Sequence, residues 1–350
     1  MKVIRWFLLP FAMLYSAAVW VRNKLFDLGV IKSYEAEIPS IVVGNLSAGG
    51  TGKTPHTELL VRILHQEYFT AILSRGYGRK TRGFVMADEG LTADDLGDEP
   101  FQFHEKFGEV MIAVDENRER GIKMLMKQVP EPDVILLDDA FQHRKVKAGL
   151  YILLTSFSCP FYSDLPLPTG NLRDNKSQRK RADIIIVTKC PPFIGEEKKK
   201  QITDRIKPLP HQKVLFSSIH YAKPKAVFQN KDFQDFEEAV VVTGIANPAP
   251  LLSELEGKFD KIVHKKFPDH HSFTKADIRS ITRAFDKLES NRKCIITTEK
   301  DAMRLKNHSE KGKLSELPLF YIPIEIQLLD CMKWFEEHIV TFINDFKTDV

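Results

Sequence analysis

Glycines followed by a lysine and a threonine, and pairs of adjacent carboxylates, are the residues of this chain best suited to chemistry. Residues 47–54 read SAGGTGKT and end in the Gly-Lys-Thr of a Walker A loop, although Ser47 stands where the strict pattern has its first glycine. In such a loop, backbone N–H groups at a helix N-terminus bind phosphates, the lysine reaches the β- and γ-phosphates, and the threonine binds Mg²⁺. We therefore predict a nucleotide-binding loop made of Ser47, Ala48, Gly49, Gly50, Thr51, Gly52, Lys53 and Thr54.

Two pairs of carboxylates could serve that loop. Residues 133–139 read DVILLDD, an apolar run that ends in Asp138 and Asp139 and is typical of a Walker B strand that holds Mg²⁺. The sequence does not divide the work between the two aspartates, and a pair that caps the next helix is the alternative. Asp98 and Glu99 form the second pair, in which one carboxylate could accept a proton from an attacking hydroxyl and the other could hold the metal.

The order of short apolar and helical runs predicts how these residues are positioned. A strand at 38–44 precedes the glycine loop and helical spacing follows at 57–68, and further strand-like runs occur at 69–73, 110–114, 134–137, 151–154 and 184–187. This alternation indicates an α/β fold with a parallel sheet flanked by helices, as in P-loop NTPases. A charged stretch at 196–200 precedes a second series of strand-like runs at 214–219, 239–243, 261–263, 294–297 and 319–322.

We expect a smaller C-terminal α/β subdomain after a loose boundary near residues 190–210. The predicted division is an N-terminal helix at 1–30, a nucleotide-binding domain at 31–200 and a subdomain at 201–350 that completes the site. A continuous sheet shared by both halves is the alternative.

The N-terminus has an apolar run without a charged side chain, residues 6–21, flanked by Lys2, Arg5, Arg22 and Lys24. About 20 apolar residues are needed to span a bilayer as a helix, so this run is short, and Pro10 interrupts it. Trp6, Tyr15 and Trp20 favour the headgroup boundary, and we predict a helix that lies in the membrane interface. A secretory signal peptide and a helix buried in the core are the alternatives.

Composition excludes several classes of protein. With 43% hydrophobic and 28% charged residues the chain is globular, and its net charge of +4 is too small to indicate nucleic acid binding. Cys159, Cys190, Cys294 and Cys331 are far apart and lack the spacing of a zinc or redox site, which indicates a reducing compartment. No obligate protein partner is indicated.

Several segments together resemble the tetraacyldisaccharide 4′-kinase family, whose motifs match in order and spacing across nearly the whole chain. These are VGNLSAGGTGKTP at 43–55, SRGYGR at 74–79, GDEP at 97–100, DDAFQH at 138–143, GNLR at 170–173, FPDHH at 267–271 and TEKDA at 298–302. Members of this family commonly have Ser or Thr at the position of Ser47. Ala140 is a mild departure, because Gly is frequent there.

The resemblance implies an activity: transfer of the ATP γ-phosphoryl group to the 4′-hydroxyl of a tetraacylated glucosamine disaccharide 1-phosphate, with Mg²⁺. It implies a peripheral or monotopic enzyme on the cytoplasmic face of the bacterial inner membrane. By the same resemblance, Asp98 is the catalytic base in a dyad with His270, or with His271, and the metal is held by Thr54, Glu99 and Asp138 or Asp139. Arginines in segments that should edge the site are candidates for binding the anionic substrate: Arg75, Arg79, Arg118, Arg120 and Arg173.

Two other functions are compatible with a nucleotide-binding loop. A membrane-associated ATPase switch carries a signature lysine in the pattern KGGxGKT, and that position is Ala48 here. A nucleotide-binding scaffold without chemistry would leave the carboxylates at 98–99 and 138–139 without a role.

Overall fold

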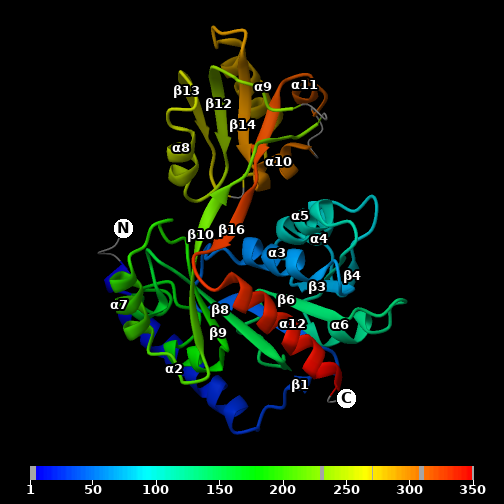
Figure 1. Cartoon of the computed structure of the whole chain (residues 1–350), viewed down its shortest axis with the longest axis vertical. Helices are drawn as coiled ribbons and strands as arrows, with labels where there is room; N and C mark the ends of the chain where they lie inside the picture. Colours follow the sequence, from blue (N-terminus) through cyan, green and yellow to red (C-terminus); the bar gives the residue numbers. More distant parts are fainter. Residues whose placement is uncertain (1–4, 229–231, 270, 307–310, 349–350) are drawn as a thin grey trace. The chain divides into compact units, whose positions relative to one another are not determined.

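The computed structural model describes residues 5–228, 232–269, 271–306 and 311–348, and the chain divides into two units. The first unit comprises Met1–Ile219 and Ile326–Val350, and the second comprises His220–Glu325. The strands β10 (Lys213–Tyr221) and β16 (Ile324–Leu328) carry the chain from one unit to the other (Figure 1).

A nine-stranded sheet forms the centre of the first unit. Its strand order is β16-β10-β9-β8-β2-β6-β3-β5-β4, and the pairs from β10 through β5 are parallel, whereas β4 is antiparallel to β5. Besides β10 and β16, the strands are β2 (Ser40–Asn45), β3 (Thr70–Ser74), β4 (Val85–Met86), β5 (Met111–Val114), β6 (Val134–Asp138), β8 (Leu150–Ser156) and β9 (Ile184–Thr188). The short strands β1 (Tyr34–Glu35) and β7 (Val146–Lys147) pair separately.

Helices cover both faces of this sheet, which explains why β2, β3, β6 and β9 are buried throughout. On one face α6 (Arg118–Leu125) and α7 (Glu196–Ile206) contribute Ile122, Leu125, Ile202 and Ile206 to the core. On the other face lie α3 (Lys53–Leu64), α5 (Asp98–Lys106) and α12 (Met332–Thr348). Apart from the N-terminal helix, the remaining described helical segments of this unit are α4 (Ala93–Leu96), η1 (Phe161–Ser163) and η2 (Lys176–Arg181).

The second unit is a smaller α/β layer structure. Its five-stranded sheet has the order β11-β15-β14-β12-β13, in which only the β11–β15 pair is antiparallel. The strands are β11 (Lys225–Ala226), β12 (Glu238–Thr243), β13 (Lys261–Lys266), β14 (Lys293–Thr298) and β15 (Leu319–Ile322). One face packs against α9 (Lys275–Asp286), α10 (Glu299–Lys306) and α11 (Lys311–Ser315), and the other packs against α8 (Ala249–Leu255).

The two units divide the chain at a different point from the expected boundary near residues 190–210. Strand β10 pairs with β9 of the first sheet, so the first unit continues to Ile219. The last helix, α12, also belongs to the first unit, because Phe335, Ile339 and Ile343 are buried in its core. The apolar spacing of α12 could not reveal which of the two cores it would join.

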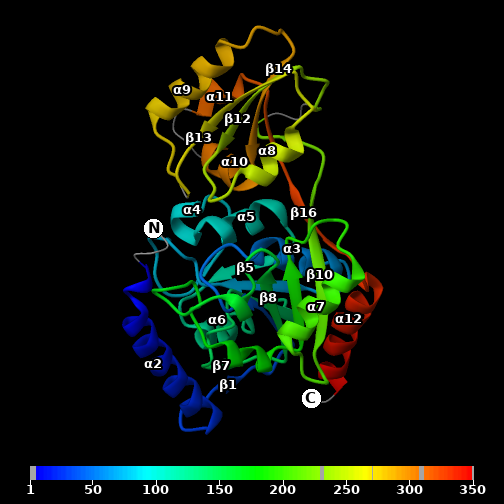
Figure 2. The same cartoon turned by 90° about the vertical axis from the view of Figure 1, so that its left-hand side faces the viewer.

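The N-terminal run forms a surface helix, α2 (Leu9–Asp27), which lies along the first unit (Figures 1 and 2). Pro10 falls in its first turn, where proline is tolerated. Its buried side chains are Ala12, Asn23 and Phe26, and the Asn23 amide donates to Asp174 Oδ1 over 2.8 Å. Large apolar side chains of the helix are exposed, and they include Phe11, Leu14 and Trp20.

This polarity is the reverse of that of a helix packed on a core. Most of the long apolar side chains of α2 are therefore exposed, and the alternative of a helix buried in the core is wrong. Among the described residues, no helix combines the length and apolar character needed to cross a membrane.

Candidate active site

The predicted phosphate loop joins the carboxyl end of β2 to the first turn of α3. Gly52 has a φ of +87° and is the N-cap of α3, and Gly49 has a φ of +125°. These left-handed conformations favour glycine, because a Cβ atom would strain the backbone there. The helix begins at Lys53, four residues before the predicted start, so Lys53 and Thr54 lie in the first turn where N–H groups are free to bind an anion.

The carboxyl end of β6 lies beside this loop, because β6 pairs with β2. Asp138 is 1% exposed and accepts hydrogen bonds from the hydroxyls of Ser74 (3.2 Å) and Thr57 (3.4 Å). Burial, followed by the negative charges of Glu99 and Asp139, raises the pKa of Asp138 to about 7. Several carboxylates therefore converge where the sequence predicts a metal.

The Asp139 carboxylate faces cations instead. Its backbone adopts a φ of +48°, its Oδ2 lies 3.6 Å from Lys53 Nζ, and the Arg173 guanidinium binds both of its oxygens. Burial opposes ionisation of Asp139, but the hydrogen bonds from Arg173 and the charge of Lys53 outweigh it and lower its pKa. Arg173 Nη2 also donates to Asn45 Oδ1 over 2.6 Å, which links this pair to the start of the loop.

Asp98 and Glu99 form the first turn of α5 and are partly exposed. Two glycines fix this turn against the loop that follows β3: a Cβ at Gly97 would lie 2.9 Å from the Tyr77 carbonyl oxygen, and one at Gly76 would lie 2.8 Å from the Leu96 carbonyl oxygen. The backbones of the GDEP and SRGY segments are thus in direct contact. Besides burial, the negative charge of Glu99 raises the pKa of Asp138, so Glu99 lies near the aspartate pair. The second carboxylate pair therefore belongs to the same site.

The predicted substrate arginines differ in their surroundings. Arg75 is exposed after β3, whereas Arg79 is bound to the Gly83 carbonyl and to Glu116, each over 2.6 Å. Arg118 is 2% exposed, and its guanidinium binds the carbonyls of Asp115 and Asp138. Arg120 pairs with Asp115.

Positive charge gathers next to the carboxylates. Burial, followed by the charges of Arg118 and Arg75, lowers the pKa of His143 to about 4, and burial lowers the pKa of Arg118 to about 10. An exposed guanidinium in such a cluster suits a phosphorylated ligand, because it can bind a phosphate. Arg75 is the member of the cluster with an exposed side chain.

The histidine pair lies in the second unit, whereas Asp98 lies in the first. His270 falls outside the described residues. His271 Nε2 lies 2.9 Å from Asp277 Oδ2, and its ring stacks on Phe267 with centroids 5.0 Å apart. Asp277 also caps α9, so His271 has a structural partner of its own.

The described residues contain no group of three or more His, Cys, Asp or Glu side chains that could hold a metal ion alone. Mg²⁺ does not require one, since it is commonly bound by one or two carboxylates together with nucleotide phosphates and waters. The charges that raise the pKa of Asp138 would be relieved by a divalent cation. The residues present therefore fit Mg²⁺.

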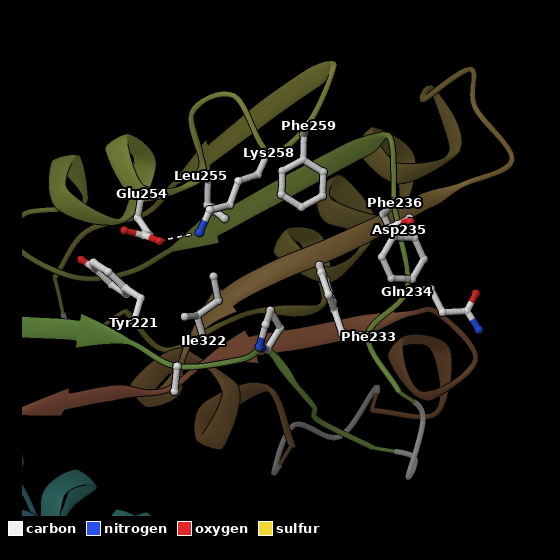
Figure 3. Close-up of a pocket in the computed structure, with 12 residues that line it drawn as sticks. Tyr221, Phe233, Gln234, Asp235, Phe236, Glu254, Leu255, Lys258, Phe259 and Ile322 are labelled. Atoms are coloured by element: carbon white, nitrogen blue, oxygen red, sulfur yellow. Dashed lines mark hydrogen bonds and ion pairs between the residues drawn. The ribbon is translucent and has the colours of Figure 1, made fainter.

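A cavity of about 190 Å³ in the second unit holds none of the predicted residues (Figure 3). Its walls include Tyr221, Phe233 and Phe259, and Lys258 donates to Glu254 at one side. Its lining includes Asp235, Glu254 and Lys258 but no glycine of a phosphate-binding turn, so the candidate site remains the carboxyl edge of β2 and β6.

Sequence reasoning missed several polar residues of the site. Asn45 binds Thr51 Oγ1 (2.7 Å) and Gly49 O (3.3 Å), and Gln142 donates to the Asn45 carbonyl over 2.5 Å. Thr57 and Ser74 hold Asp138. The available signal was position, because Asn45 and Ser74 both end otherwise apolar strands of a parallel sheet.

Comparison with known proteins gives a consistent result. The family model described as Tetraacyldisaccharide-1-P 4'-kinase matches residues 4–344. A "Tetraacyldisaccharide 4'-kinase" of Flavobacterium johnsoniae is 44% identical over 99% of both chains, and one of Bacteroides thetaiotaomicron is 44% identical over 98% of this chain and 94% of its own. A crystal structure of LpxK from Aquifex aeolicus, described as an "apo" form in complex with ATP, superimposes with a TM-score of 0.76. It is 25% identical in sequence and covers 97% of this chain and 99% of its own.

Proposed function

Since the chain belongs to the Tetraacyldisaccharide-1-P 4'-kinase family, it is an ATP-dependent kinase of lipid A biosynthesis, and we propose that its phosphoryl transfer takes place at the carboxyl edge of β2 and β6. The acceptor is the 4′-hydroxyl of a tetraacyldisaccharide 1-phosphate. The observation that carries the location is the meeting of Lys53, Asp138 and Asp139 beside the phosphate loop.

Residues 47–54 bind the triphosphate of ATP in this proposal. Backbone N–H groups at the start of α3 and the Lys53 ammonium neutralise the phosphates as negative charge shifts during transfer. The contact of Lys53 with Asp139 holds the ammonium in the site while no phosphate is present.

The Thr54 hydroxyl and the carboxylates of Asp138 and Glu99 would hold Mg²⁺ in this proposal. Asp138 is the stronger ligand of the aspartate pair, since its neighbours are hydroxyls, whereas Asp139 is already matched with Lys53 and Arg173. Asp139 then acts mainly by positioning those two cations. The metal supplies charge neutralisation at the transferred phosphoryl group.

Asp98 is the proposed general base, with His270 as its partner in a dyad. The acceptor hydroxyl oxygen attacks the γ-phosphorus, the bond from that phosphorus to the β–γ bridging oxygen breaks, and the hydroxyl proton moves to the Asp98 carboxylate. ADP and the 4′-phosphorylated lipid leave. His271 is the weaker candidate, because its ring is engaged by Asp277.

Arginines next to the site bind the anionic groups of substrate and nucleotide. Arg75 is the first candidate, since it is exposed and its charge reaches His143. Arg173 is the second, at Asp139, and could exchange that carboxylate for a phosphate. Arg79 and Arg118 are held by protein groups and would act by shaping the loops around the site.

Helix α2 brings the enzyme to its acylated substrate. Its outward apolar side chains and the basic residues at its ends suit the headgroup region of an anionic membrane. The resulting location is the cytoplasmic face of the bacterial inner membrane, with the protein peripheral or monotopic.

The activity is tested by incubating the purified chain with γ-labelled ATP, Mg²⁺ and the acylated disaccharide 1-phosphate in mixed micelles. Label in the lipid supports the proposal. Label in free phosphate alone would indicate the ATPase switch, and no transfer at all would leave a nucleotide-binding scaffold.

A further inference from the structure

Side chains of residues that lie outside the phosphate loop in the sequence donate hydrogen bonds to the loop's carbonyl oxygens. Four consecutive carbonyl oxygens accept such hydrogen bonds: Gly49 from Asn45 Nδ2 (3.3 Å), Gly50 from Lys189 Nζ (2.5 Å), Thr51 from Thr188 Oγ1 (2.8 Å) and Gly52 from His56 Nδ1 (2.7 Å). A loop that binds phosphate with its N–H groups must turn its carbonyl oxygens away, because these oxygens repel an anion. The four side chains provide that orientation.

His56 is one of three buried members of this set, together with Asn45 and Thr188. It is 2% exposed, lies in the first turn of α3, and its two ring nitrogens have different partners. Because a carbonyl oxygen only accepts, Nδ1 must carry the proton that is donated to Gly52, and Nε2 is then left to accept from the Ser217 hydroxyl at 3.0 Å. The contacts define one neutral tautomer of the ring.

Ser217 contributes to the phosphate loop's surroundings through both its hydroxyl and its backbone carbonyl. Its hydroxyl orients the His56 ring, and its carbonyl accepts a hydrogen bond from the backbone N–H of Cys190 over 2.9 Å. Thr188, the last residue of β9, and Lys189 directly precede Cys190, and Lys189 adopts a φ of +59°. A left-handed backbone at a residue other than glycine is typical of sites where position matters more than local strain.

The carbonyl of Gly52 and the N–H of Lys53 belong to the same peptide plane. In a trans peptide these two groups point in opposite directions, so holding the carbonyl fixes the direction of the N–H. Fixing the carbonyl direction matters most at Gly52. A glycine backbone can adopt several conformations, of which a φ of +87° is one, so without a contact the peptide plane could turn.

We propose that His56 is a positioning residue of the kinase, which binds the Gly52 carbonyl from inside the protein and thereby directs the Lys53 N–H toward the triphosphate. Ser217 keeps the His56 ring in the required orientation. This inference rests on the proposed nucleotide site at residues 47–54. It adds a requirement for a side-chain N–H donor at position 56, beside the 3.2 Å hydrogen bond that the backbone N–H of the same residue makes to the Gly52 carbonyl.

The chain contains a matched control. His65 Nδ1 lies 2.8 Å from the Val61 carbonyl, the same contact between a ring nitrogen and the carbonyl four residues earlier, but at the opposite end of α3. Replacing His65 removes a histidine contact of this kind without touching the phosphate loop.

The test measures ATP affinity by calorimetry, KM for ATP, kcat and Tm for the variants H56L, H56N, S217A and H65L. H56L removes the side-chain donor of the Gly52 carbonyl, which keeps only the longer 3.2 Å hydrogen bond from the backbone N–H of residue 56, and should raise the Kd and KM for ATP about tenfold, with a smaller change in kcat. H56N keeps an N–H donor near the Gly52 carbonyl and should recover most of the affinity. S217A should raise KM about threefold, because the ring keeps its contact with Gly52.

Wild-type KM and Kd in a folded H56L protein would overturn the inference. Equal losses in H56N and H56L, or a similar loss in H65L, would also overturn it, because packing alone would then explain them. If H56L does not fold, an unchanged KM in S217A contradicts the proposal. The nucleotide site itself is judged separately by K53A: full ATP-dependent activity in K53A removes the site, whereas loss in K53A with wild-type H56L removes only the role of His56.

Discussion

Asp138 and Asp139 are consecutive residues, but their carboxylates lie in opposite electrostatic surroundings. Asp138 lies between the hydroxyls of Thr57 and Ser74 with further carboxylates nearby, whereas Asp139 is bound by Arg173 and approached by Lys53. The left-handed backbone at Asp139 separates the two directions. Because their surroundings differ, the same substitution at Asp138 and at Asp139 should have different effects.

Replacing Asp138 with asparagine should weaken Mg²⁺ binding more than the same change at Asp139. Loss of a direct ligand should cost at least the ~10–100-fold in metal affinity that changes around a metal site usually cause. D139N should keep metal dependence and raise KM for ATP, because Lys53 and Arg173 lose their partner. Turnover measured as a function of Mg²⁺ concentration distinguishes the two variants. A larger loss of metal affinity in D139N than in D138N would contradict the assignment of Asp138 as the metal ligand.

Binding of Mg²⁺ and nucleotide should depend on pH through Asp138. With its pKa raised to about 7, the carboxyl group is protonated below that pH and ionised above it. Metal binding requires the ionised form, so affinity should rise as the pH increases through 7, and binding at pH 6 should release a proton. Calorimetry in buffers of different ionisation enthalpy measures this release. D138N serves as the reference, since the nucleotide's own titration is the same in both proteins. Equal proton release in both would exclude Asp138 as its source.

Lys53→Ala should nearly abolish turnover, because the ammonium neutralises charge on the phosphoryl group being transferred. Lys198, an exposed residue of α7, provides the control, and K198A should retain wild-type kcat and KM. Steady-state kinetics with labelled ATP measure kcat and KM for both variants. Turnover in K53A close to that of the wild type would count against the phosphate loop assignment.

Asp98→Ala should lower kcat by about 10²–10⁴-fold, the usual contribution of a general base, while nucleotide affinity is retained. Asp94 in the neighbouring helix α4 pairs with Lys80 at the surface, and D94A should leave kcat unchanged. Single-turnover rates and equilibrium nucleotide binding together test this role. A D98A protein that loses nucleotide binding but keeps its chemical rate would exclude it.

Charged residues on the outer face of α2 should detach the protein from membranes. Phe11 and Leu14 are 62% and 69% exposed, and the double variant F11D/L14D should bind anionic vesicles at least about tenfold more weakly, since each buried apolar side chain contributes about 1.5–3 kcal/mol. Phe193 is 99% exposed outside this helix, and F193D is the control. Flotation of F11D/L14D equal to that of the wild type would rule out the role of α2.

The strand, glycine loop and helix around Lys53 could be predicted because each depends on local rules. Apolar residues in a run of strand length, glycines at left-handed positions and helical spacing after Thr57 are visible along the chain. The same is true of the strands at 134–137, 184–187 and 239–243, which the structure confirms with ends shifted by one residue at most. The boundary between the two units was harder to predict from the sequence, because α12, at the far end of the chain, packs in the core of the first unit.

The sequence by itself determined the fold class and the strand, glycine turn and helix around Lys53, and it singled out the proposed phosphate loop and acidic residues, since these follow from backbone sterics and from the spacing of residue types. Only the tertiary structure decided which aspartate faces Lys53, that Arg118 is buried and that His56 meets Ser217, 161 residues away. The reason is the strand order: β6 beside β2 brings the carboxylates to one side of the loop, and β8, β9 and β10 bring Thr188 and Ser217 to the other. Contacts between distant segments depend on which strands become neighbours, and no local pattern of residues encodes that choice.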